Sequence, residues 1–103
     1  MAFTGHENQY ISLETASAWT ENYRNANPNS INGHYFSMDT INGILAQGNC
    51  LGIRVYYAID DAGVKQLVIV GTDAYENDLY EGLIADKSIQ CPPTCGAINP
   101  LNS

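Results

Sequence analysis

The sequence predicts an α+β fold in which two N-terminal helices pack on a small antiparallel sheet, with an extended tail at the C-terminal end. Residues 53–59 and 64–70 are rich in β-branched and aromatic residues, and a short loop that ends in Gly63 separates them. This is the pattern of a β-hairpin, since glycine readily takes the positive φ of a tight turn. Upstream of the hairpin, apolar residues recur at helical spacing. We expect residues 1–103 to form a single domain, as their number suggests.

The first helix is expected to follow a flexible lead-in of residues 1–10. Ser12 is a candidate cap, because its oxygen can accept the free N–H groups of a first helical turn. The helix should run to about Asn25. We expect Trp19 to anchor its apolar face in the core. That face is formed by Leu13, Ala16, Trp19 and Tyr23.

A second, shorter helix is expected after a loop at residues 25–33, which is rich in Asn, Pro, Ser and Gly. Ser37 is its candidate cap, and Gly48 can end it as a left-handed C-cap. Its apolar face consists of Ile41, Ile44 and Leu45.

The hairpin register determines which side chains face the helices. A four-residue loop, residues 60–63, would place Ile59 opposite Val64. The odd-numbered residues of 53–59 would then share the core face with the even-numbered residues of 64–70. The opposite face would carry Tyr56, Leu67 and Ile69, which is too apolar for open water. We expect the tail or another chain to cover it.

The rest of the chain is acidic and then rich in proline. Residues 72–86 contain five acids and no base, with a strand or loop expected at residues 83–85. The tail, residues 91–103, contains three prolines and cannot form a helix or a central strand. It should lie as an extended, pinned arm.

The net charge of −7, from eleven acids against four bases, describes a small acidic protein. This balance repels phosphate backbones and anionic membrane surfaces, which argues against nucleic-acid and membrane partners. A basic protein partner or a cation fits the charge better. The N-terminal residues lack the basic and apolar regions of a signal peptide, so we expect a cytoplasmic protein, with export by another route left open.

The three cysteines could form a disulfide, bind a metal ion or remain free thiols. Cys91 and Cys95 are separated by three residues, a spacing that allows a local disulfide. The same pair could be half of a zinc site, with Cys50 as a third ligand and His34 or His6 as the fourth. Otherwise all three are free thiols, Cys50 being a small buried hydrophobe.

Two further groups of residues, an acidic run and a histidine, could form functional sites. The acidic run that includes Asp73, Asn77 and Asp78 could offer oxygen ligands to calcium, but it lacks the EF-hand pattern, and a solvated loop explains it equally. His34 beside two aromatic residues could act as a general base. No recognisable motif places a nucleophile near it, so an enzyme with a site at His34 remains an alternative rather than the expectation.

Five segments form a recognisable set: residues 11–16, 50–57, 67–71, Cys91-Pro92-Pro93-Thr94-Cys95 and residues 99–102. Together they resemble a family of small uncharacterised single-domain proteins common in Bacteroidetes-type bacteria. The resemblance covers roughly residues 10–103 and implies a bacterial source. It implies no activity, but it favours a structural role for the three cysteines over loose thiols.

Taken together, these features predict a non-enzymatic module for protein–protein interaction or self-assembly. Tyrosine and apolar side chains are favoured at interfaces. A small metal-binding protein that uses Cys50, Cys91 and Cys95 is the second hypothesis, and an enzyme is the third. The predicted interface comprises Tyr56, Leu67, Ile69, Tyr75 and Tyr80.

Overall fold

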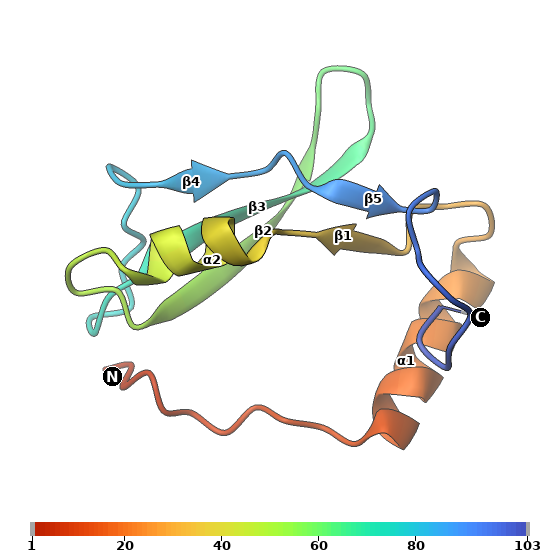
Figure 1. The fold of residues 1–103 in the computed structure, drawn as a ribbon, viewed down its shortest axis with the longest axis horizontal. Coiled ribbons are helices and arrows are strands. Elements are labelled where there is room, and N and C mark those ends of the chain that lie inside the picture. The colour runs from red at the N-terminus through yellow and green to blue at the C-terminus, as the bar shows by residue number, and fades with distance from the viewer. Residues whose placement is uncertain (1, 103) are drawn as a thin grey trace. The chain divides into compact units, whose positions relative to one another are not determined.

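A computed structural model describes residues 2–102 and confirms the α+β fold class, with two helices and antiparallel sheets (Figure 1). The chain divides into two compact units. Residues 2–7 and 36–88 form the first, here called the sheet unit. Residues 8–35 and 89–102 form the second, here called the disulfide unit.

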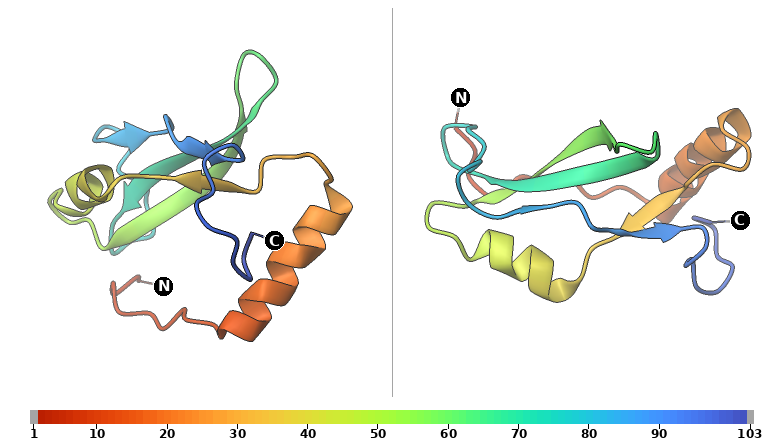
Figure 2. Two further views of the ribbon diagram at one scale, coloured as in Figure 1. Left: turned by 45° about the vertical axis from the view of Figure 1, so that its right-hand side comes forward. Right: turned by 90° about the horizontal axis from the view of Figure 1, so that it is seen from above.

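The sheet unit consists of one helix and a three-stranded antiparallel sheet. Helix α2 is Met38–Leu45, and the strands are β2 (Gly52–Ile59), β3 (Lys65–Thr72) and β4 (Ile84–Ala85). The strand order is β2-β3-β4, so β3 is central (Figure 2). Strand β4 lies within residues 83–85, where the sequence predicts either a strand or a loop. The predicted hairpin is confirmed, since β2 and β3 pair along their whole length.

The hydrophobic core of the sheet unit is small. Ile44 of α2 and Ile69 of β3 are buried at 1% and 3% exposure. They lie on the face that α2 covers, because the position of a Cβ on Gly71 would be in contact with Ile44 and alternate residues of a strand share a face. Val70 and Thr72 are buried on the opposite face, each at 4% exposure. No other side chain among the described residues is buried.

The predicted hairpin register is wrong by one residue. Asp60 pairs with Val64, its N–H donating to the Val64 carbonyl at 2.9 Å, and only residues 61–63 form the loop. Gly63 takes the expected positive φ, +82°. Ile59 therefore lies opposite Lys65 rather than Val64. A slip of one residue moves every side chain of a strand to the other face.

The Asp60 side chain fixes this turn. Its Oδ1 accepts the N–H groups of Ala62 and Val64, each at 2.9 Å, and Oδ2 accepts the amide of Gln66 at 3.0 Å. The bond from Val64 and then that from Gln66 are the largest causes that hold the pKa of Asp60 below its ordinary value. Because its side chain accepts these backbone N–H groups, Asp60 belongs to the paired ladder and not to the loop.

The disulfide unit contains helix α1, Leu13–Ala26, and a two-stranded antiparallel sheet. Strand β1 (Gly33–Tyr35) pairs with β5 (Ile89–Cys91), and Gly33 lies opposite Cys91. Cys91 and Cys95 form a disulfide that closes a short loop directly after β5. Of the three cysteine alternatives, the local disulfide is the one that the structure contains.

Both helix caps are confirmed, but other predictions about the helices are wrong. The Ser12 and Ser37 hydroxyls accept the N–H groups of Thr15 and Thr40, at 3.0 and 3.1 Å. Helix α2 ends at Leu45, and the positive φ that follows is at Asn49 (+66°), not at Gly48.

Helix α1 buries none of its residues. Trp19, the predicted anchor, is 62% exposed, so the prediction that it fixes α1 in the core is wrong. Within its own unit, α1 is held to the tail by polar contacts. The Ser17 hydroxyl donates to the Pro100 carbonyl at 3.1 Å, and the Arg24 guanidinium donates to the Leu101 carbonyl at 2.8 Å.

Candidate interaction edge

Strand β2 is an open edge of the three-stranded sheet. One side of β2 pairs with β3 over eight consecutive residues. Within residues 2–102, no strand pairs with its other side. An open edge presents unpaired backbone donors and acceptors, which can pair with the strand of another chain.

The hydrogen-bond pattern identifies the outward-facing groups. The bond from Asp60 to Val64 marks residue 60 as a position that bonds to β3. In an antiparallel ladder such positions recur at every second residue. Even-numbered residues of β2 therefore bond to β3, and the N–H and C=O groups of the odd-numbered residues point outward. Gly71 agrees with this alternation, because its carbonyl accepts from Leu79 on the far side of β3.

The outward residues also carry uncovered apolar side chains. Val55, Tyr57 and Ile59 are 50%, 94% and 74% exposed. They lie on the same face as Ile69 and Gly71, but beyond the part that α2 covers. Surfaces that bind an added strand combine unpaired backbone groups with neighbouring apolar side chains.

Most of strand β2 lacks the devices that usually protect a sheet edge. Only its beginning has a neighbour there, since the Phe3 ring lies beside Arg54 and a Cβ on Gly5 would lie 3.1 Å from the Leu51 carbonyl oxygen. Protected edges are short, bulged, covered, or interrupted by charges or proline. The strands β4 and β5 are two and three residues long. Strand β2 has eight residues, an unbroken register, no proline and a single charged residue, Arg54.

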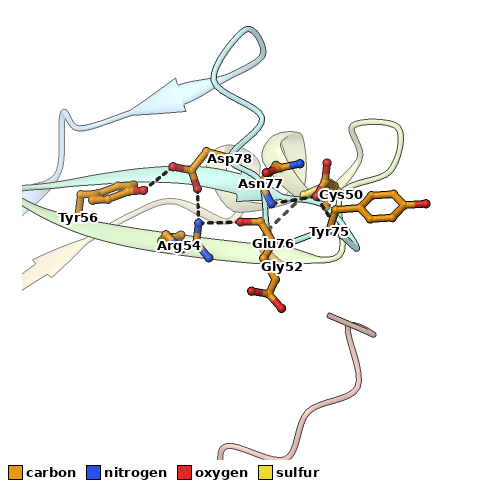
Figure 3. A network of polar contacts seen from close by, with 9 residues as sticks. Cys50, Gly52, Arg54, Tyr56, Tyr75, Glu76, Asn77 and Asp78 are labelled. Atoms are coloured by element: carbon orange, nitrogen blue, oxygen red, sulfur yellow. Dashed lines mark hydrogen bonds and ion pairs between the residues drawn. The ribbon is translucent and has the colours of Figure 1, made fainter. Parts of the chain in front are cut away.

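That single charge is tied inward, across the sheet. Arg54 donates to an oxygen of Asp78 at 2.7 Å and to the Glu76 carbonyl at 3.2 Å, and the Tyr56 hydroxyl donates to the other Asp78 oxygen (Figure 3). Asp78 bridges to Thr72, beside β3 on the side away from β2. The hydrogen bond to Asp78 is the main cause that raises the pKa of Arg54. The guanidinium is thus directed away from the open edge.

The structure does not bring the predicted interface residues together on one face. Tyr56 shares its face with Val68 and Val70, whereas Leu67 and Ile69 lie on the opposite face. Ile69 is buried and unavailable to a partner. The other two predicted residues, Tyr75 and Tyr80, are 81% and 71% exposed in the segment that follows β3.

Sequence reasoning missed the outward residues of β2 because it assigned them to the core. A signal was present: an aspartate followed three residues later by glycine favours a three-residue loop that ends in a bulge. That loop gives the observed register and uncovers Tyr57 and Ile59.

The proposed zinc ligands do not form a site. Cys91 and Cys95 are bonded to each other, so neither offers a thiolate. Cys50 is half-buried and its sulfur lies 3.3 Å from the Gly52 carbonyl. The described residues contain no group of three or more His, Cys, Asp or Glu side chains that could hold a metal ion.

The proposed calcium ligands have other partners. Asp73 Oδ1 accepts the N–H groups of Tyr75 and Asn77, at 2.9 and 3.0 Å, and so shapes the turn. The Asp78 carboxylate accepts the hydrogen bonds from Arg54 and Tyr56 described above. Both carboxylates therefore serve the fold.

His34 lies in β1, opposite Gln90. It is partly buried, and this burial lowers its pKa. The nearest cysteine along the paired strand is Cys91, which the disulfide removes as a nucleophile.

No known protein family, curated protein or solved structure matches this chain. The resemblance to a bacterial family stays a prediction from the sequence. None of the helices formed by residues 2–102 is long and apolar enough to cross a lipid bilayer.

Proposed function

We propose that the chain is a protein-interaction module that binds an extended segment of a partner as an additional strand along β2. The observation that carries this proposal is the eight-residue edge strand β2, with which no other strand of residues 2–102 pairs on its outer side. Main-chain hydrogen bonds to the outward groups would supply affinity, and the exposed side chains beside them would select the partner.

The small core supports the same proposal. Among the apolar side chains of residues 2–102, only Ile44, Ile69 and Val70 are buried. A chain that leaves much of its apolar surface exposed gains stability when a partner covers that surface. Strand addition would cover Val55, Tyr57 and Ile59 together.

Replacing Val55 by proline tests strand addition, because it removes one outward N–H without removing a bond to β3. The probe is a library of short random peptides displayed on phage and selected on sparsely immobilised protein, so that copies cannot pair with one another. We expect selected peptides to bind Val55→Pro about tenfold or more weakly than the wild type.

The matched control is Val55→Thr, which keeps the N–H at the same position. It should bind the selected peptides as the wild type does, and both variants should show the wild-type far-UV circular dichroism. Peptides that bind Val55→Pro as tightly as the wild type would contradict the proposal, as would a selection that yields no binder.

We also propose that the protein works in an oxidising compartment. The Cys91–Cys95 disulfide supports this, because disulfides persist in such compartments and are rare in the cytosol. Alkylation of intact source cells followed by intact-mass measurement should label one thiol, Cys50. Three labelled thiols per chain would reject this proposal.

A further inference from the structure

We infer that the partner strand is β2 of a second copy of this chain, paired antiparallel about a twofold axis at Tyr56. This inference rests on the proposed strand addition and names its partner. The outward groups of β2 belong to Ile53, Val55, Tyr57 and Ile59. An axis at Tyr56 pairs all four with the same four in the other copy. Moving the axis by one residue in either direction leaves only three such pairs within the strand.

The side chains in this register are complementary. On one face, Ile53 lies opposite Ile59 of the other copy, and Val55 lies opposite Tyr57. Pairs of β-branched and aromatic residues across neighbouring strands are stabilising. On the other face, the two copies of Tyr56 meet at the axis.

The register also avoids a clash of like charges. Arg54, the one charged residue of β2, would lie opposite Ala58 of the other copy rather than opposite its own equivalent. Like charges directly opposite each other destabilise a strand pair. Because Arg54 is already held by Asp78, pairing need not bury an unpartnered cation.

The second copy would cover the surface that the first leaves open. Helix α2 contacts β2 and β3 and lies beside Gly71, which is the ladder partner of Ile53. The twofold axis brings Tyr57 and Ile59 of the other copy next to this covered end of β2. Each helix would then lie near the exposed half of the neighbouring strand, which increases the apolar area removed from water.

The charge distribution allows two copies to meet at this edge, because β2 brings no acid to the contact. The chain carries −7 overall, yet residues 40–59 contain no acid. Two copies repel each other at long range, and salt screens that repulsion. We therefore expect dimerisation to strengthen as salt concentration rises. A basic partner would show the opposite dependence, and weakening by salt would overturn self-pairing.

The first experiment is light scattering with size-exclusion chromatography over a range of protein concentrations. We expect the mass to rise from 11.2 kDa towards twice that value. Tyr57→Lys should weaken dimerisation at least tenfold, because it places a charge within the strand pair. Tyr75→Lys makes the same substitution at a residue of similar exposure away from the edge, and it should dimerise as the wild type does.

The second experiment fixes the register and does not depend on how Tyr57→Lys folds. Single cysteines are placed at 55, 56 or 57 in a Cys50→Ser background, and the protein is oxidised in air. Residues directly opposite each other at positions that are not hydrogen-bonded lie about 4.5 Å apart between Cα atoms, within reach of a disulfide. Only Tyr56→Cys should give a covalent dimer. Cross-linking at 55 or 57 instead would overturn the register.

The outcomes separate this inference from the proposed function. A chain that stays monomeric and forms no cross-link, but binds displayed peptides through the β2 edge, rejects self-pairing and keeps strand addition. A chain that neither dimerises nor binds peptides rejects both. Equal loss of dimer in Tyr57→Lys and Tyr75→Lys places the contact elsewhere and rejects the inference.

Discussion

Replacing Ile44 by alanine is expected to lower the free energy of unfolding of the sheet unit by about 2–5 kcal/mol. Ile44 is the most buried side chain of the described residues, at 1% exposure, and it packs where α2 meets β3 beside Gly71. Truncation removes apolar contacts and leaves a cavity that its neighbours cannot fully close. Urea unfolding followed by far-UV circular dichroism would measure the loss.

Leu45→Ala is the matched control, since it removes the same number of carbon atoms one residue along the same helix. Leu45 is 42% exposed, so its truncation should cost much less. Similar losses for the two variants would mean that α2 does not pack through Ile44, and that the core described above is wrong.

The expected loss at Ile44 is large relative to the total stability, because little else is buried. Domains are stable by only about 5–15 kcal/mol in total. With Ile69 and Val70 as the other buried apolar residues, a single truncation can remove a large part of that margin. Covering the exposed side chains of β2 would add buried apolar area to this small core, which connects the core to the proposed binding at β2.

The local elements could be predicted from the sequence. The hairpin and both serine caps depend on residues close together in the chain, and the structure confirms them. The cap at Ser12, for example, needs only a hydroxyl three residues before the N–H that it accepts. Such features can be recognised from a few neighbouring residues in the sequence.

The register could not be read from strand composition alone. Both strands are apolar on both faces, so the pattern of side chains does not choose between two pairings that differ by one residue. Asp60 makes the choice, by accepting the N–H groups of Ala62 and Val64 and so setting a three-residue loop. The predicted interface depended on the other register, and its residues therefore lie on two faces.

Contacts between distant segments could not be predicted either. The pairing of β1 with β5 joins residues 33–35 to residues 89–91 through two strands that are too short to show periodicity. For α1, the helical spacing predicted the helix but not the exposure of Trp19. An apolar face shows that a helix is able to pack against other apolar residues. Whether such residues lie next to it depends on the rest of the fold.

Replacing Gly71 by alanine is expected to lower the free energy of unfolding by about 1–3 kcal/mol, because it overfills the interface between α2 and β3. A Cβ on Gly71 would lie 2.7 Å from Cys50 Sγ and 3.1 Å from Gln47 Nε2. Gln47 cannot move freely, since its side chain donates to the Ile44 carbonyl and accepts from the Leu83 N–H.

A double-mutant cycle with Cys50→Ala tests whether this close approach is the cause of the loss. Cys50→Ala removes the nearest atom, so Gly71→Ala should cost less in that background, with a coupling of about 0.5–3 kcal/mol. Gly52→Ala is the control, because its Cβ would lie 3.8 Å from Thr72 Oγ1, an ordinary contact. Additive losses at Gly71 and Cys50 would show that crowding against the sulfur is not the reason, and that Gln47 or the strand backbone resists the extra methyl group instead.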